Sequence, residues 1–410
     1  LATAQMRPVA WMLDSPHNRS SEDTLITSKH QKPSLLRHVL AALLVLGTFT
    51  VALAQGSEEA EPEDAASLIE DGHFYLQSGG CALAQFYFQD ALRVEPNNVA
   101  AHVGKGRALA CQGAYPTAIE AYQAALAIDA NHLDALIHLA ITYQNQYQND
   151  PSAYQGRLAD ALDVIQRAER INADDARVQN TKGIILYQLG DLSQARTTLE
   201  RAMNLASGDN SGLSNPEKST VQVNLGRTYR DLDQLELALQ AFRRAVVLDP
   251  ASATAHNNLG NIAFRLGDCE TAEYELSQAV NLDPNSLSAA SQLGISLFEC
   301  GEVANSVPRL ETATKMPGAV FLPPLFTYLA RAYMEVGRVD DAVFVAQQGA
   351  LLSEPESADA YYWLGRAYAQ RGGPSDQQNA TQAYRRALEL DADYITGDGG
   401  LSFMSQLPRP

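Results

Sequence analysis

The feature that most constrains the fold of this chain is a small residue that recurs about every 34 residues between residues 72 and 365. In most copies a second small residue follows after about 12 residues and a third after about 19. A glycine inside a helix costs about 1 kcal/mol relative to alanine, so its repetition indicates close contact between helices. The first of these columns consists of Gly72, Gly106, Ala140, Gly183, Gly226, Gly260, Gly294, Ala330 and Gly365.

The best-preserved copy of this pattern lies between Ala253 and Ser286. It holds two short amphipathic helical patterns, which Gly267 and Asp268 separate and which Asp283-Pro284 ends. A helical hairpin of this size cannot bury its apolar face alone and has to stack on copies of itself. About nine such units between residues 65 and 394 therefore predict an all-α solenoid, in which each repeat contacts only its neighbours.

The units resemble the tetratricopeptide repeat, a helix–turn–helix unit of 34 residues with a small–aromatic–small–proline pattern. Tyr229, Phe242 and Pro250 show that pattern in one unit. The unit from Ala253, with its AHNNLGN segment, is similar to repeats of the O-linked N-acetylglucosamine transferase superhelix. Only the repeat character carries over, because the chain has no room for that enzyme's catalytic domain. The resemblance implies a right-handed superhelix whose inner groove binds an extended peptide or a partner protein.

Residues 1–54 have the layout of a secretory signal peptide. A basic flank that ends at Arg37 precedes an apolar run, Val39–Ala54, which closes with Ala52-Leu53-Ala54. Its sixteen residues fall short of the roughly 20 that span a bilayer. We therefore expect cleavage near Ala54 and an extracytoplasmic, periplasmic or secreted, mature protein. The alternative is an uncleaved membrane anchor, and the true translation start stays open.

The remaining organisation follows from composition. We expect an acidic linker over residues 55–64, the solenoid over 65–394 and a tail over 395–410. A polar insertion after Tyr143 interrupts the third unit between its two helices; Tyr147 and Tyr154 make it either a contact loop or a tolerated length variant. Residues 206–218 are a candidate hinge. Pro308 is expected to kink the second helix of the seventh unit or to delay its start.

The net charge and the absence of catalytic motifs limit the classes of function that this sequence can have. The formal net charge of −18 disfavours nucleic acid and anionic membranes as partners. The sequence has no phosphate-binding GK[ST] loop, no G-x-S-x-G and no H-E-x-x-H, and its histidines are scattered. His102 and His256 share one repeat phase that faces the neighbouring helix. We therefore predict no enzyme, cofactor or metal, but a scaffold for envelope or secretion-type assembly; a regulatory subunit of a partner enzyme is the alternative. The oligomeric state stays open.

The four cysteines form two pairs with separations of 30 and 31 residues. Each pair joins the start of a second helix to the end of the next unit's first helix, and an exported protein meets an oxidising environment. We predict the disulfides Cys81–Cys111 and Cys269–Cys300; four buried thiols are the alternative. No pair has zinc-ligand spacing.

The candidate binding residues lie on the face of each first helix that lines the groove in this family. In the fifth to seventh units this face carries amides, which can pair with the backbone of an extended peptide. Asn224, Asn258 and Gln292 share one phase, similar to the asparagine ladder of the transferase repeats. Nearer the C-terminus, aromatic rings lie beside arginines, the residue types enriched in binding hot spots. The predicted site consists of Asn224, Arg227, Asn257, Asn258, Asn261, Phe264, Gln292, Tyr328, Arg331, Tyr362, Trp363 and Arg366.

A column of arginines runs along the same face, at Arg107, Arg227, Arg331 and Arg366. Because guanidinium forms bidentate pairs with carboxylates, the column would suit an acidic segment or a chain-terminal carboxylate. The alternative is that these arginines pair with acids of the chain itself, such as Asp231 and Glu335.

Overall fold

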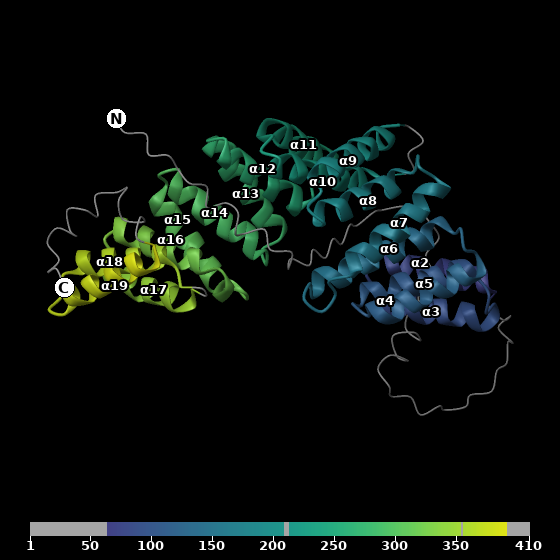
Figure 1. Cartoon of the computed structure of the whole chain (residues 1–410), viewed down its shortest axis with the longest axis horizontal. Helices are drawn as coiled ribbons and strands as arrows, with labels where there is room; N and C mark the ends of the chain where they lie inside the picture. Colours follow the sequence, from purple (N-terminus) through teal and green to yellow (C-terminus); the bar gives the residue numbers. More distant parts are fainter. Residues whose placement is uncertain (1–63, 209–212, 354–355, 392–410) are drawn as a thin grey trace, which may run out of the picture. The chain divides into compact units, whose positions relative to one another are not determined.

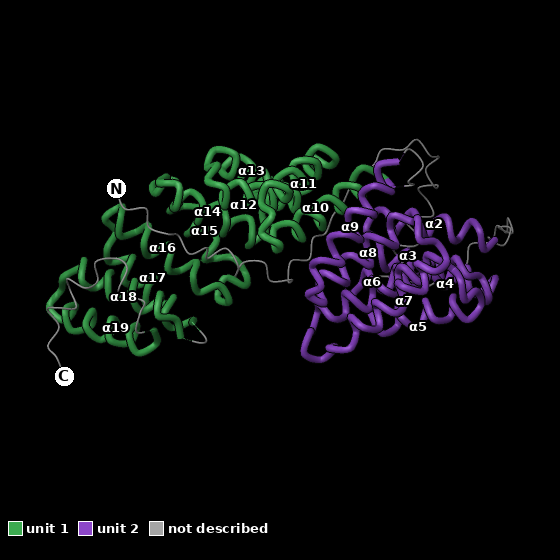
Figure 2. Tube along the Cα trace, turned by 45° about the horizontal axis from the view of Figure 1, so that its top comes forward, with its two compact units in different colours: residues 1–18, 214–410 green, residues 19–213 purple. Residues whose placement is uncertain are grey.

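The structure is a computed structural model, and it describes residues 64–208, 213–353 and 356–391. The chain divides into two compact units at Leu213 (Figure 2). We refer to the described residues before this point as the N-terminal unit and to those from Ser214 onward as the C-terminal unit. The described residues form α-helices and one short 3-10 helix, and no strand occurs among them.

The N-terminal unit consists of four helical hairpins, seen in the purple to teal part of Figure 1. The first helix of each hairpin packs against its second helix, and the second packs against the first helix of the next hairpin. The helices are α2 (Ala65–Gln77), α3 (Cys81–Val94), α4 (Val99–Cys111), α5 (Tyr115–Ile128), α6 (Leu133–Asn149), α7 (Arg157–Ile171), α8 (Ala176–Gln188) and α9 (Leu192–Ala206).

The C-terminal unit has the same internal arrangement, with five hairpins, green to yellow in Figure 1. Its helices are α10 (Asn215–Asp231), α11 (Leu235–Leu248), α12 (Ala253–Arg265), α13 (Cys269–Leu282), α14 (Leu287–Glu299), α15 (Val303–Thr314), α16 (Pro323–Glu335), α17 (Val339–Leu352), α18 (Ala358–Arg371) and α19 (Asp376–Leu390). The 3-10 helix η1 (Ala319–Phe321) lies between α15 and α16. The all-α solenoid of nine repeats that the sequence predicts is thus confirmed.

Local chemistry sets the ends of the helices. Asp268 caps α13 by accepting a hydrogen bond from the backbone N–H of Thr271 at 3.1 Å, and Ser252 caps α12 through the N–H of Ala255 at 3.2 Å. Such caps satisfy donors that have no partner inside the helix. Gly267 turns the chain between these helices at a φ of +81°, where a side chain would be strained. The Gly-Asp pair is therefore the turn that the sequence indicates.

Where the column holds glycine, the first helix can approach a large side chain of its second helix. A Cβ atom at Gly226 would lie 2.6 Å from the Phe242 ring, and one at Gly106 would lie 2.5 Å from the Tyr122 ring. Phe242 and Tyr122 are among the most fully buried side chains of the described residues. The glycine column is thus explained by packing inside each hairpin.

Three irregular positions differ in detail from the sequence expectations. The polar insertion after Tyr143 is partly helical, because it extends α6 to Asn149 before the turn to α7. Pro308 lies inside α15, which begins on time at Val303, so the expectation of a late start is wrong. In the candidate hinge, residues 215–218 form the first turn of α10, which Ser214 and Glu217 close with a capping box. Residues 209–212 lie outside the described residues, and the hinge stays a prediction.

Several predicted segments lie outside the described residues: the signal peptide, the acidic linker up to residue 63 and the tail from 395. Within the three described ranges, no helix combines the length and the apolar character that crossing a bilayer requires.

Candidate functional site

The predicted aromatic and arginine residues of two consecutive first helices, α16 and α18, meet one another and a ring of the preceding first helix, α14. The guanidinium carbon of Arg331 on α16 lies 4.7 Å from the ring centroid of Phe298 on α14 and 4.7 Å from that of Trp363 on α18. It also lies 4.9 Å from the ring of Tyr328, one turn earlier on its own helix. These distances are those of cation–π contacts. We call Phe298, Tyr328, Arg331 and Trp363 the arginine stack.

Arg331 also forms an ion pair with Glu299, the last residue of α14, at 3.2 Å. About a quarter of each of the two side chains is exposed, and the Nε atom of Arg331 is buried without a hydrogen-bond partner. Burial, together with the negative charge of Glu299, raises the pKa of Tyr328. The arginine thus pairs with an acid of the preceding repeat, and the alternative partner named from the sequence, Glu335 on its own helix, is exposed.

Arg366 extends the arginine stack on α18 but is itself exposed. Its guanidinium carbon lies 5.4 Å from the Trp363 ring, and it donates a hydrogen bond to the hydroxyl of Tyr362 at 3.2 Å. The indole N–H of Trp363 donates to Asp359 at 3.1 Å. Because the Tyr362 side chain is buried and held in place, its hydroxyl fixes the position of the Arg366 guanidinium. Within the described part of the chain, Arg366 has no ion pair, and its charge is available to a ligand.

The amide residues are placed differently. Asn258, Asn261 and Gln292 are each less than a tenth exposed. Asn261 donates to the side-chain oxygen of Gln292 in the next repeat, and Asn258 donates to the backbone carbonyl of Thr254 at 2.8 Å. These amides therefore already use part of their hydrogen-bonding capacity inside the protein. Asn224, Arg227 and Phe264 are half-buried, as is Asn257, whose Oδ1 atom is buried without a partner.

Sequence reasoning missed Phe298, Glu299 and Asp359 as members of the site. Phe298 could have been found, because it has the same repeat phase as Phe264, which was selected. Glu299 has the phase of Glu335, but only the packing of α14 on α16 shows that the acid of the preceding repeat is the one in reach.

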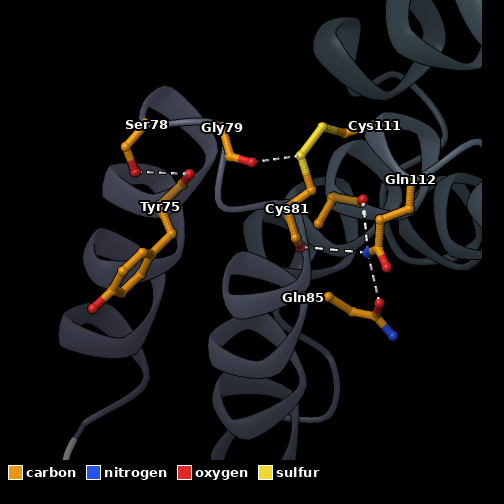
Figure 3. The surroundings of a disulfide bond; sticks show 8 residues. Tyr75, Ser78, Gly79, Cys81, Gln85, Cys111 and Gln112 are labelled. Carbon is orange, nitrogen blue, oxygen red and sulfur yellow. Dashed lines mark hydrogen bonds between the residues drawn. A yellow bond between two sulfur atoms is a disulfide. The ribbon is translucent and has the colours of Figure 1, made fainter. Parts of the chain in front are cut away.

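Both cysteine pairs are bonded as disulfides, in the pairing that the sequence predicts. The Cα atoms are 6.0 Å apart in Cys81–Cys111 and in Cys269–Cys300. Figure 3 shows the first bridge at the start of α3, where the amide of Gln112 donates to the side chain of Gln85 at 2.8 Å. Each disulfide therefore links a second helix to the first helix of the next repeat, once in each unit.

The two histidines of equal phase make related contacts. The Nε2 atom of His102 lies 2.9 Å from the carbonyl oxygen of Pro96, and that of His256 lies 3.1 Å from the carbonyl oxygen of Pro250. Among the described residues, His256 but not His102 also contacts a carboxylate, with its Nδ1 atom 2.5 Å from Glu275. This hydrogen bond raises the pKa of His256. Within the described ranges, no group of histidine, cysteine or acidic residues is arranged to hold a metal ion.

Comparison with known proteins finds partial similarities. The anaphase-promoting complex subunit CDC16 of Saccharomyces cerevisiae is 24% identical over 188 residues, which are 45% of this chain and 21% of that protein. The chain therefore spans about a fifth of the length of that relative. A tetratricopeptide repeat protein from Parabacteroides merdae ATCC 43184 is 15% identical, with a TM-score of 0.46, over 66% of this chain and 98% of that one. A thermophilic protein of the same kind from Thermus thermophilus is 21% identical, with a TM-score of 0.43, over 48% and 98%.

Family models cover most of the repeats. The tetratricopeptide repeat model matches residues 72–132, and the model described as the Cilia and flagella-associated protein 70 C-terminal domain matches residues 148–398. The second match extends over more than half of the chain. The chain therefore belongs to the tetratricopeptide repeat proteins, in the family of the Cilia and flagella-associated protein 70 C-terminal domain.

Proposed function

We propose that this protein is a non-enzymatic scaffold that binds an extended peptide or a partner protein on the first-helix face of its C-terminal unit. Tetratricopeptide repeats generally mediate protein–protein interactions. The relative CDC16 is by its name a subunit of a multiprotein complex, which supports an assembly role.

The observation that carries this proposal is the arginine stack with Arg366 at its edge. Arg366 is exposed, lies against Trp363 and is held by the Tyr362 hydroxyl. A positioned arginine beside aromatic rings is the composition of binding hot spots, because such side chains lose little freedom when a partner binds. We expect the buried amides of α12 and α14 to contribute mainly by fixing the neighbouring helices.

The test compares the full-length protein with two variants in capture from an extract of its own cells, followed by mass spectrometry and binding to the purified partner. Arg366→Glu reverses the charge of the exposed arginine on α18. Arg309→Glu is the matched control, because Arg309 is exposed on a second helix, α15. The proposal predicts that the captured partner binds to purified wild-type protein and to Arg309→Glu. It also predicts that Arg366→Glu binds this partner at least tenfold more weakly. Equal binding by all three would place the interaction elsewhere.

We further propose that the protein is exported and that its signal sequence is removed near Ala54. The basic flank, the apolar run Val39–Ala54 and the closing Ala52-Leu53-Ala54 support this, as do the two disulfides. N-terminal sequencing of the native protein is the test. Gln55 as the first residue supports export, whereas an intact Val39–Ala54 segment favours the alternative of a membrane-anchored assembly factor. A role as a regulatory subunit would appear as changed turnover in a partner enzyme.

A further inference from the structure

Large apolar side chains are exposed at one edge of the C-terminal unit. Phe321 in the 3-10 helix η1 and Leu351 in the last turn of α17 are each 83% exposed, and Val320 is 50% exposed. A Cβ atom at Gly349 would lie 3.7 Å from the carbonyl oxygen of Pro323, so the end of α17 packs beside the residues that join η1 to α16. We call Val320, Phe321 and Leu351 the apolar edge.

The repeat pattern does not account for the apolar edge. The position of Leu351 is occupied by Lys315 in the preceding repeat and by Glu389 in the following one, as expected for a side chain that faces solvent. The edge lies on the eighth of the nine hairpins, so it is not the end face of the solenoid. Single exposed apolar residues are ordinary, but a group of them marks a contact surface.

The last helix ends at the same edge. Arg386, one turn before the end of α19, donates a hydrogen bond to Glu356 at 2.8 Å and forms an ion pair with it. Glu356 belongs to the short connection between α17 and α18, five residues after Leu351. The chain therefore leaves α19 close to the apolar edge.

The residues that follow Asp391 lie outside the described residues, but their sequence has the length and the composition to cover the apolar edge. Three glycines between residues 397 and 400 precede the segment LSFMSQL, residues 401–407, which we call the apolar tail. Its apolar members are Leu401, Phe403, Met404 and Leu407. Leu401 follows Asp391 by ten residues, and an extended chain of that length reaches roughly 33–36 Å, about three helix diameters.

We propose that the apolar tail of this chain binds the apolar edge and covers it. Removal of both apolar surfaces from water drives the contact. The tether holds the apolar tail at a millimolar effective concentration, which favours it over a second copy of the chain or a partner protein. The apolar edge belongs to η1 and to a second helix, so this contact is independent of ligand binding at Arg366 on a first helix.

The test measures binding of a labelled peptide of residues 397–410 to the full-length protein. In wild type the tethered tail occupies the apolar edge. We therefore expect the peptide to bind wild type at least tenfold more weakly than it binds the double variant Phe403→Ser/Met404→Ser, in which the edge is free. Ser402→Ala/Ser405→Ala changes only polar side chains of the same segment and should bind the peptide as weakly as wild type.

A substitution in the apolar edge completes this test. Leu351→Asp, added to the double variant, should abolish peptide binding. Val247→Asp is the matched control, because Val247 on α11 has the repeat phase of Leu351 and is 79% exposed. Circular dichroism checks that each variant is folded. The proposal is overturned if the double variant binds the peptide no more tightly than wild type, if Leu351→Asp retains the binding, or if Val247→Asp abolishes it as well.

A second readout identifies the occupant of the apolar edge directly. With p-benzoylphenylalanine in place of Phe403, illumination links the tail covalently to the side chains that it contacts, and mass spectrometry locates them. Links within one chain to residues 319–322 or 348–352 support the proposal. Links between two chains would make a second copy the occupant, and links to any other segment would place the tail elsewhere; either result overturns the proposal.

Discussion

The two units share one repeat scaffold, but the same position of the first helix has different surroundings in each unit. In the C-terminal unit, Arg331 lies among three aromatic rings and pairs with Glu299 of the preceding repeat. In the N-terminal unit, Arg107 of equal phase on α4 is half-buried and has no ion pair within the described ranges. The two units share the small residues that allow the helices of a hairpin to pack, whereas the polar and charged contacts of the first-helix face differ between the units. Four pairs of equivalent positions allow this comparison to be tested.

The largest effect is expected from the disulfides, at positions where the units should behave alike. Closing loops of 30 and 31 residues stabilises a protein by roughly 3 kcal/mol in the chain-entropy model. Replacing both cysteines of Cys81–Cys111 by serine should therefore lower the free energy of unfolding of the N-terminal unit by about that amount. The same replacement at Cys269–Cys300 should lower the free energy of unfolding of the C-terminal unit equally. Denaturant unfolding with hydrogen exchange, which reports on each unit, measures this. If the free energy of unfolding of one unit falls by less than about 1 kcal/mol, strain in the folded state or residual structure in the unfolded chain offsets the entropic effect of closing the loop.

The glycine column should give the next effect, again equal in the two units. Gly106→Ala and Gly226→Ala place a Cβ atom against the buried rings of Tyr122 and Phe242, respectively. Overpacking costs about 1–3 kcal/mol, and the better helix propensity of alanine offsets about 1 kcal/mol of it. We expect a net loss of about 1–2 kcal/mol for each variant in thermal unfolding. Gly156→Ala, where no neighbour lies within 4 Å, is the control and should change stability by less than about 0.5 kcal/mol.

Substitution of the equivalent arginines, Arg331 and Arg107, should have different effects on the stability of the two units. Arg331→Gln removes the contacts with the rings and leaves Glu299 without its cation, so we expect a loss of about 1–2 kcal/mol in the stability of the C-terminal unit. Arg107→Gln removes no hydrogen bond or ion pair within the described ranges and should be within about 0.5 kcal/mol of wild type, or slightly more stable. Chemical denaturation of both variants checks this. A comparable loss for Arg107→Gln would contradict the difference between the two positions.

The smallest effect concerns the two histidines of equal phase. The neighbours of His256 are a carbonyl and a carboxylate, both acceptors, and only the protonated ring can donate a hydrogen bond to each of them. Its pKa is raised in the folded state, so the folded protein holds this proton more tightly than the unfolded chain. The stabilisation is complete below about pH 6.5 and is lost as the pH rises through the folded-state pKa. Unfolding measured between pH 6 and pH 9 should show this slope in wild type and not in His256→Gln.

His102→Gln is the matched control in the N-terminal unit, because the described contacts of His102 include the carbonyl of Pro96 but no carboxylate. We expect it to keep the pH slope of wild type. If the slope instead persists in His256→Gln, another group carries the pH dependence.

The sequence by itself determined the architecture. A period of 34 residues with small residues in register specifies helical hairpins, and each hairpin can bury its apolar face only by stacking on its neighbours. It also indicated the cysteine pairs and the positions on the first helices that carry arginine and aromatic residues. Those inferences need only repeat phase, which is a property of the chain.

Only the tertiary structure decided which partners these residues meet. Arg331 has an acid four residues later on its own helix, yet its partner is Glu299 of the preceding repeat. Asn261 is turned toward Gln292 of the next repeat rather than left free for a ligand. The physical reason is that side-chain contacts between stacked helices depend on the distance and rotation of one repeat against the next. This distance and this rotation are set by how the side chains of two neighbouring repeats pack together, which the sequence of one repeat does not determine.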